Sequence, residues 1–515
     1  MRLISAAVLC LVAAGGATAQ TTPALPTSDA YYKDGEQTLA ARAAIKPNKK
    51  RARNVILFVG DGMDPTTVAA ARIFDGQSRG EEGEENFLSF ERFPYLAMAK
   101  TYNTNAQTPD SAGTMSAMVT GVKTKAGVIS VSNAANYGDC ASALGAEVLT
   151  LGELSEMAGM ATGVISTARL THATPAAVYA HSASRNWESD ADMPDAAKAQ
   201  GCKDIAAQLI DFPYGDGLEV ALGGGRADFL PVDVADPERA DAKGRRKDGR
   251  NLVEEWKAKS PAHAFAWNKA QFDAVDASSA PRLLGLFEPS HMRYEADRAG
   301  DASGEPSLAE MTGKAIDILS QNKNGFFLMV EAGRIDHAHH AGNAARALKD
   351  TQAYAEAVAL AREKTSDRDT LIIVTADHGH TLAFQGYPSK GNNILGLATA
   401  IAGGEGGGAD ADGHALAADS LPYTTLVYAN GPGSIMKGDQ KSNKRPAPSE
   451  EEALARDYRQ QAAIPMASET HGGQDVTIYA SGPRAYLFGG VVEQHYIFHV
   501  INDALDLTSR ARAEQ

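Results

Sequence analysis

The sequence predicts an α/β protein with a doubly wound, mostly parallel central sheet and helices on both faces. Several short apolar, β-branched runs show continuous rather than alternating hydrophobicity, which is typical of strands buried on both faces. Helical periodicity appears between those runs, and strands that alternate with helices are typical of doubly wound sheets. The chain has 515 residues, which is long enough for one large sheet with insertions.

The predicted strands follow one another along most of the chain. They are residues 55–59, 163–165, 326–330, 371–374 and 476–479. Apolar residues at steps of three and four predict a helix over 308–319, and a second helical pattern runs from 344 to about 362. Ligands of such sheets bind at the carboxyl ends of the strands, so the residues that follow the runs are the first candidates for a site.

Two regions break this alternation. Residues 227–250 are charged, contain proline and show neither a helical nor a strand period. Residues 390–466 contain a stretch of Gly, Ala and acidic residues over 403–413 and a basic stretch over 441–447. We interpret 390–466 as a small surface subdomain inserted between the last strands of a single domain that spans 20–515.

The N-terminus predicts export. A basic residue at position 2, an apolar run over about 3–14 and small residues up to Ala19 form a secretory signal peptide, residues 1–19. No later stretch approaches about 18 uninterrupted apolar residues, and the C-terminus is too polar for a lipid-anchor signal. We therefore expect a periplasmic or secreted protein without a membrane anchor.

The net charge and the cysteines give further information on partners and covalent bonds. There are 49 Lys and Arg against 64 Asp and Glu, a formal net charge of −15, which argues against a nucleic-acid-binding surface. One of the three cysteines, Cys10, lies in the predicted signal peptide. In an exported chain the remaining pair, Cys140 and Cys202, predicts a disulfide, and the alternative is two unpaired buried thiols.

Acidic residues and histidines gather at the ends of the predicted strands, a pattern typical of a metal site. They are Asp61, Glu331, Asp336, His340, Asp377, His378 and His471. Asp336 and His340 are four residues apart, so on a helix both can bind one ion, with His471 as third ligand. Oxygen and nitrogen ligands without thiolate favour a catalytic zinc site. The alternative, separate helix caps and surface acids, does not explain why the whole set falls at strand ends.

A nucleophile and an anion-binding group are also suggested. Ser111 follows a Pro-Asp turn and opens a run of small residues, where a hydroxyl at a helix N-terminus lies in positive potential. The alternative for Ser111 is a plain N-cap. Arg185, His172 and Thr174 follow the strand 163–165. An arginine can bind phosphate with two hydrogen bonds, although a lone arginine is more often a surface charge.

Taken together, these motifs resemble the metal-dependent alkaline phosphatases. The matching segments are Gly60-Asp61-Gly62-Met63, Asp110-Ser111-Ala112, residues 330–340, residues 375–378 and Glu469-Thr470-His471. The likeness runs from about Tyr31 to about His499. Residues 172–175 and 185–187 match as well, which places the chain nearer to the animal-type branch of that family.

The resemblance implies a site of two zinc ions and one magnesium ion that hydrolyses small phosphate monoesters through a phosphoserine on Ser111. Asp336, His340 and His471 would bind one zinc ion. Asp61, Asp377 and His378 would bind the second. Asp61 would also bridge to a magnesium ion shared with Thr174 and Glu331. Arg185 would hold the phosphoryl oxygens, His172 would lie behind the magnesium, and His337 and His380 would be pocket histidines.

The animal-type branch also carries a calcium site outside the pocket. The residues that match it are Glu238, Phe287 through its carbonyl group, Glu288 and Glu305. The resemblance further implies that 20–515 is the catalytic domain, that 390–466 corresponds to the crown subdomain, that Cys140 pairs with Cys202, and that the protein is a homodimer.

Three other functions remain open at this level. A phosphodiesterase or a sulfatase can be built on the same metal scaffold, although residues 111–115 lack the C/S-x-P-x-R context that a sulfatase nucleophile needs. A non-catalytic exported protein that binds metal or phosphate would explain the ligands, but it would not require a serine and an arginine at these positions.

Overall fold

The computed structural model describes residues 25–513 except 240, 280–281, 404–407 and 437–444. The predicted signal peptide, with Cys10, lies outside the described residues. Contacts divide the chain into two units, residues 1–46 and 47–515. In the first, helix α1 (Ala30–Ala43) begins after Asp29, whose side chain accepts hydrogen bonds from the backbone N–H groups of Tyr31 and Tyr32.

A ten-stranded sheet forms the centre of the second unit, in the order β15-β2-β14-β8-β1-β7-β3-β4-β6-β5. Its strands are β1 (Asn54–Gly60), β2 (Tyr95–Lys100), β3 (Ala161–Arg169), β4 (Val220–Gly224), β5 (His263–Ala266), β6 (Arg282–Leu286), β7 (Phe326–Ala332), β8 (Thr370–Ala376), β14 (Val476–Ser481) and β15 (Val491–Glu493). All five predicted strands are present, and the doubly wound fold is confirmed.

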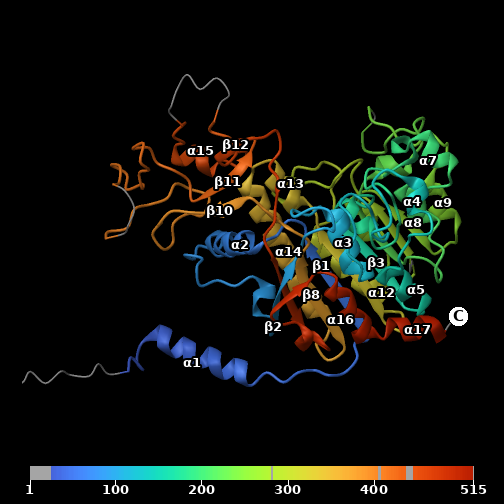
Figure 1. Cartoon of the computed structure of the whole chain (residues 1–515), viewed down its shortest axis with the longest axis horizontal. Coiled ribbons are helices and arrows are strands. Elements are labelled where there is room, and N and C mark those ends of the chain that lie inside the picture. The colour runs from blue at the N-terminus through green and yellow to red at the C-terminus, as the bar shows by residue number, and fades with distance from the viewer. Residues whose placement is uncertain (1–24, 240, 280–281, 404–407, 437–444, 514–515) are drawn as a thin grey trace, which may run out of the picture. The chain divides into compact units, whose positions relative to one another are not determined.

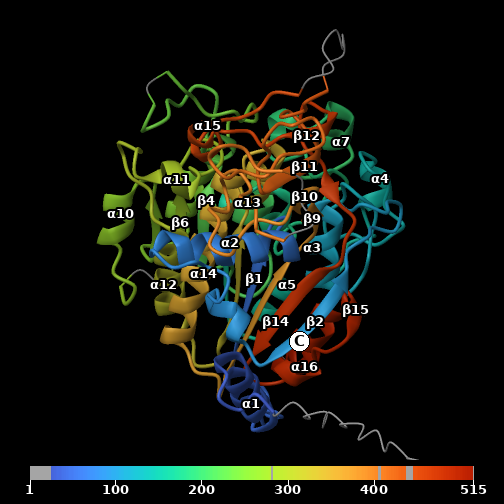
Figure 2. The ribbon, with the colours of Figure 1, turned by 90° about the vertical axis from the view of Figure 1, so that its left-hand side faces the viewer.

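Strand direction is uniform in this sheet except at β14. The central strands β1, β7 and β8 are parallel, whereas β14 pairs antiparallel with both β8 and β2. The sequence pattern did not reveal this reversal because the run in β14 is as continuously buried as those of its parallel neighbours. Figure 2 shows β14 beside β2, with β15 at the edge.

Helices cover both faces of the sheet. On one face lie α2 (Pro65–Ser78), α12 (Leu308–Leu319) and α14 (Ala344–Lys364), and the last two confirm the predicted helices. On the other lie α3 (Ser111–Thr120), α5 (Leu151–Met157), α6 (Ala173–Ala176), α16 (Tyr496–Leu505) and α17 (Leu507–Ala513). In Figure 1, α14 and α3 stand on opposite sides of β1. The core lies between these layers, and residues 55–59 of β1 have no exposed surface.

The remaining helices are short. They are α4 (Cys140–Ala143), α7 (Asp195–Ala199), α8 (Ile205–Ile210), α9 (Leu252–Ala258), α10 (Lys269–Ala274), α11 (Glu295–Arg298) and α13 (Arg334–His340), with 3-10 turns η1 (Ser89–Arg92), η2 (Asp190–Asp192), η3 (Arg226–Phe229) and η4 (Ala485–Leu487). The turn η3 overlaps the start of the predicted irregular region 227–250.

A second, three-stranded sheet forms between β8 and β14. It has the order β10-β11-β12 and consists of β10 (Leu382–Phe384), β11 (Leu426–Gly431) and β12 (Ala462–Pro465), with α15 (Glu450–Leu454) in the same stretch of chain. A two-stranded ladder of β9 (Gly379–His380) and β13 (His471–Gly472) joins the two ends of the insertion. We call residues 379–472 the inserted segment. The narrower boundary 390–466 stays a prediction.

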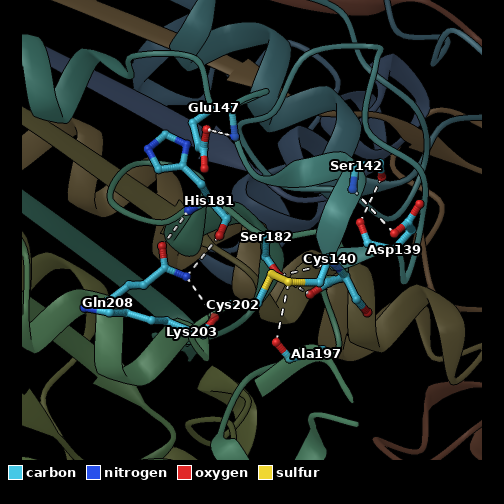
Figure 3. The surroundings of a disulfide bond; sticks show 12 residues. Asp139, Cys140, Ser142, Glu147, His181, Ser182, Ala197, Cys202, Lys203 and Gln208 are labelled. Carbon is cyan, nitrogen blue, oxygen red and sulfur yellow. Dashed lines mark hydrogen bonds between the residues drawn. A yellow bond between two sulfur atoms is a disulfide. The ribbon is translucent and has the colours of Figure 1, made fainter. Parts of the chain in front are cut away.

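Cys140 and Cys202 form a disulfide with a Cα–Cα distance of 6.0 Å. Figure 3 shows that it ties α4 to the segment before α8. There the Gln208 side chain bonds the backbone of His181 and, through its amide nitrogen, the carbonyl of Lys203. Because Trp187 packs in the same small apolar cluster as Cys140, the disulfide supports the loop that carries Arg185.

Candidate metal centre and nucleophile

The candidate site lies at the carboxyl ends of the central strands. Asp61 follows β1 directly, Asp377 follows β8, and Glu331 is the penultimate residue of β7. The register pairs Gly60 with Ala376 and with Ala332, so these three strands end at the same level. His471 reaches this edge differently. It precedes β14, and the reversed direction of that strand brings its start to the edge where the parallel strands end.

The first group of ligand-type side chains surrounds Ser111. His378 Nε2 lies 3.3 Å from Asp61 Oδ1 and 3.3 Å from Asp377 Oδ2. Ser111 Oγ is 3.1 Å from His378 Nε2 and 3.5 Å from Asp61 Oδ1. All four residues are buried. Asp110, not Ser111, is the N-cap of α3, and its side chain accepts a hydrogen bond from Gly113 N–H. The Ser111 hydroxyl is therefore free to face the ligand group.

The second group is built on α13. Asp336 Oδ1 lies 3.3 Å from His340 Nε2 and 3.3 Å from His471 Nε2, and the two histidine nitrogens are 3.1 Å apart. The sequence assigned His380 only to the pocket. In the structure its Nε2 is 2.9 Å from Asp336 Oδ1, and its Nδ1 is 2.6 Å from Glu469 Oε2. Glu469 was missed as a site residue, although it lies two residues before His471.

The third group has buried polar atoms without partners. Asp61 Oδ2, Thr174 Oγ1, Glu331 Oε1 and His172 Nδ1 are shielded from solvent, and within the described residues none makes a hydrogen bond of normal geometry. Ligand atoms of Asp61, His172 and Glu331 all lie within 4.8 Å of one another. Such atoms are costly to bury unless something binds them. This group therefore fits a cation.

The pKa shifts of the buried carboxyl groups also indicate a cation site. Burial, together with the neighbouring carboxylates Asp377 and Asp336, raises the pKa of Asp61 well above its usual range. Burial also raises the pKa of Asp377, and it raises the pKa of Glu331 to about 7. Burial acts on Asp336 too, but its histidine neighbours, above all His340, hold the pKa of that carboxyl well below normal. Four carboxylates packed together without solvent need positive charge to remain ionised.

Arg185 is held between Asp110, the residue before Ser111, and His172. Its Nη1 donates to Asp110 Oδ2 at 3.0 Å, and its Nη2 lies 3.1 Å from His172 Nε2. Asp110 was missed as a site residue, although it lies directly before Ser111. His337 lies beside His172, and the centroids of the two rings are 5.4 Å apart.

Two of the predicted calcium residues, Glu288 and Glu305, contact Arg293. The Arg293 Nε donates to Glu288 Oε1 at 2.8 Å, and its backbone N–H donates to Glu305 Oε1 at 2.9 Å. Glu305 Oε2 is buried and without a partner in the described chain, and burial raises the pKa of Glu305 to about 8. Glu238 Oε2 accepts from Arg226 at 2.8 Å, so it is already engaged.

Phe287, whose carbonyl group was predicted to bind calcium, is buried immediately after β6. The sequence missed Asp301, whose Oδ2 is also buried and unpartnered among the described atoms. Burial raises the pKa of Glu305 and of Glu288, and the charge of Asp301 adds to both shifts. Carboxylate and carbonyl oxygens are the ligands that calcium prefers.

In the described part of the chain, no helix has the length and apolar character needed to cross a membrane.

Known proteins share the sequence pattern and the fold of this chain. A family model described as alkaline phosphatase matches residues 52–507. The tissue-nonspecific alkaline phosphatase of Felis catus is 43% identical over 479 residues, which cover 92% of this chain and 87% of that protein. The Gallus gallus enzyme is 45% identical over 461 residues, 88% of this chain and 84% of that protein. The structure of Thermus thermophilus alkaline phosphatase covers 92% of this chain and 95% of that chain, with a TM-score of 0.62 and 24% identity, and agrees in fold.

Proposed function

The chain belongs to the alkaline phosphatase family and is a metal-dependent phosphomonoesterase, and from that premise we propose which of its residues perform the reaction. Ser111 is the nucleophile and Arg185 binds the phosphoryl oxygens. Three cations complete the site, two zinc ions and one magnesium ion. Asp336, His340 and His471 hold one zinc ion.

The other two cations share a ligand. Asp61, Asp377 and His378 hold the second zinc ion, and Asp61, Thr174 and Glu331 hold the magnesium ion. The partnerless buried oxygens of Asp61, Thr174 and Glu331 support the magnesium assignment, because carboxylate and hydroxyl oxygens suit that ion. Imidazole and carboxylate groups suit zinc. When bound, such ions neutralise the charge of the transferring phosphoryl group and lower the pKa of coordinated hydroxyl groups.

The protein's own groups provide attack and positioning. In the first step, the bond from Ser111 Oγ to phosphorus forms while the bond from phosphorus to the ester oxygen breaks. The hydroxyl proton of Ser111 passes to solvent, and the ester oxygen takes up a proton and leaves as the alcohol. In the second step, water attacks the phosphoserine, and the serine hydroxyl and inorganic phosphate are released. Arg185, fixed by Asp110, and the N-terminus of α3 face the phosphoryl oxygens through both steps.

One observation carries this proposal. The hydroxyl of Ser111 lies 3.1 Å from His378 and 3.5 Å from Asp61, two of the residues assigned to the second zinc ion. A serine with only a structural role at the start of α3 would accept a hydrogen bond from the helix backbone, and Asp110 performs that role instead.

The test is the Ser111→Ala variant, assayed for hydrolysis of a phosphate monoester and for covalent labelling by radioactive phosphate. We expect activity to fall by at least a thousandfold and labelling to disappear, with the metal content unchanged. Activity within tenfold of the parent would show that the phosphoserine route is wrong. Turnover of a diester and of a sulfate ester, measured in parallel, separates this function from the two alternatives on the same scaffold.

Three finer features belong to the same proposal. Glu238, Phe287, Glu288 and Glu305 hold a calcium ion, supported by the unpartnered buried oxygen of Glu305. The mature protein is exported, supported by the leader pattern of residues 1–19. It acts as a homodimer, an expectation that rests on the family resemblance.

A further inference from the structure

A tyrosine of the inserted segment is connected to Asp336, a proposed zinc ligand, through two histidines. Tyr428 lies on β11, and its hydroxyl is 2.7 Å from His339 Nδ1. His339 lies on α13, between Asp336 and His340 in the sequence. Tyr428 is 2% exposed and His339 is fully buried, so water does not compete for this contact.

The second ring nitrogen of His339 is also occupied. Its Nε2 lies 3.2 Å from the hydroxyl of Thr67, a buried residue of α2. A neutral imidazole has one donor and one acceptor, and a hydroxyl group can serve either. The His339 ring is thus held in its plane from two sides, by β11 and by α2.

The face of this ring supports a second histidine. The rings of His339 and His380 are stacked, with centroids 4.7 Å apart and planes inclined by 30°. The two ring nitrogens of His380 contact carboxylates. Its Nε2 lies 2.9 Å from Asp336 Oδ1, and its Nδ1 lies 2.6 Å from Glu469 Oε2. Glu469 fixes one edge of the His380 ring and His339 fixes its face. A tilt of His339 would therefore free His380 to turn away from Asp336.

We propose that Tyr428 and His339 are positioning residues that hold His380 against Asp336, so that the inserted segment forms part of the support of the metal centre. This inference rests on the proposed role of Asp336 as a zinc ligand. Groups that hydrogen-bond to metal ligands commonly set how tightly the metal is held, and Tyr428 acts on Asp336 through two intermediate rings.

The test compares zinc release from Tyr428→Phe and from the parent, each loaded with zinc and mixed with an excess of a chromophoric chelator. The substitution removes only the hydroxyl group. We expect about 3- to 10-fold faster release of one zinc ion per chain, in line with the loss of one buried hydrogen bond in a metal-supporting network. We expect kcat to fall in the same proportion and KM to change little.

Three further variants separate positioning from general packing. Tyr423→Phe removes a hydroxyl from another tyrosine that lines the same cavity of the inserted segment, and it should release zinc at the parental rate. Thr67→Val should accelerate release as Tyr428→Phe does, whereas Thr67→Ser, which keeps the hydroxyl, should restore the parental rate.

The following results would contradict the inference. If Tyr428→Phe releases zinc as slowly as the parent, or if Tyr423→Phe accelerates release equally, the inference is wrong while the proposed function stands. If Tyr428→Phe lowers the melting temperature of the metal-free protein but leaves zinc release unchanged, Tyr428 is only a packing residue, which also overturns it. A parent that binds no zinc would overturn the ligand assignment together with this inference.

Discussion

Arg185 Nη1 donates to Asp110 Oδ2 at 3.0 Å, and Asp110 is the residue immediately before Ser111. The other oxygen of the same carboxylate accepts from the backbone N–H groups of Gly113 at 3.1 Å and Gly127 at 3.0 Å. One side chain therefore fixes the start of α3, a neighbouring loop and the guanidinium group. The nucleophile and the proposed phosphate-binding group are aligned through a single carboxylate.

Asp110→Asn should loosen Arg185 without removing the helix cap, because asparagine is as good an N-cap as aspartate. The amide oxygen of asparagine can keep the bonds from Gly113 and Gly127, but its NH2 group is a donor and cannot accept from Arg185, so the bond to the guanidinium group is lost. We expect the inhibition constant of inorganic phosphate to rise about tenfold, with a melting temperature within about 2 °C of the parent. An unchanged inhibition constant would show that Asp110 does not position Arg185.

Removal of the metals should abolish activity and destabilise the fold. Without cations, the buried carboxylates of Asp61, Glu331 and Asp377 repel one another. We expect dialysis against a chelator to eliminate turnover and to lower the melting temperature by about 5 °C or more, and zinc with magnesium to restore both. Ser111→Ala should show the same thermal response because its ligands are intact. Full activity after exhaustive dialysis would refute the metal requirement.

The buried carboxyl group of Glu156 predicts a pH dependence away from the site. Burial, and after it the charge of Glu219, raises the pKa of Glu156 from 4.5 to about 9. The folded protein therefore keeps a proton that the unfolded chain releases near pH 4.5. The stability that this proton contributes is fully present below pH 4.5 and is lost as the pH rises through about 9.

Glu156→Gln removes this titration while keeping the shape of the side chain. Relative to the parent, the variant should gain stability as the pH rises from 5 to 9, reaching an advantage on the order of 1–3 kcal/mol at pH 9. Urea unfolding of both proteins at several pH values measures the difference. A difference that does not vary with pH would contradict the assigned shift.

The disulfide should make a measurable contribution to stability. Cys140 and Cys202 are 62 residues apart, and closing a loop of that length stabilises a fold by about 3–4 kcal/mol in the loop-entropy model. The double variant Cys140→Ala, Cys202→Ala should lose that amount in urea unfolding. The parent in the presence of a reductant should behave like the variant, and a loss below about 1 kcal/mol would argue that the bond is dispensable.

Residues next to a predicted strand end could be placed from the sequence. Asp61, Asp377 and His378 directly follow continuous apolar runs, and parallel strands bring such positions to one edge. The i, i+4 spacing of Asp336 and His340 likewise needed only helix geometry, which α13 provides. These relationships are local, so one periodicity and one rule of topology were enough.

Relationships across long stretches of sequence were not predictable in the same way. The contact of Arg185 with Asp110 spans 75 residues, and that of Tyr428 with His339 spans 89. Neither pair shares a periodic pattern, and a lone arginine or tyrosine carries no sign of its partner. The position of His471 depends on the reversed strand β14, whose hydrophobic run resembles that of a parallel strand.

The reversed direction of β14 has a consequence for the design of chimeric proteins. The polypeptide leaves the sheet at the end of β8 and re-enters it at the same edge through β14, closed by the short ladder of β9 and β13. The segment between β8 and β14 begins and ends at the same edge of the sheet. Its length therefore does not affect the register of the strands. A chimera could exchange most of this excursion for that of a relative, and a hydroxyl at position 428 is the feature such a graft would have to retain.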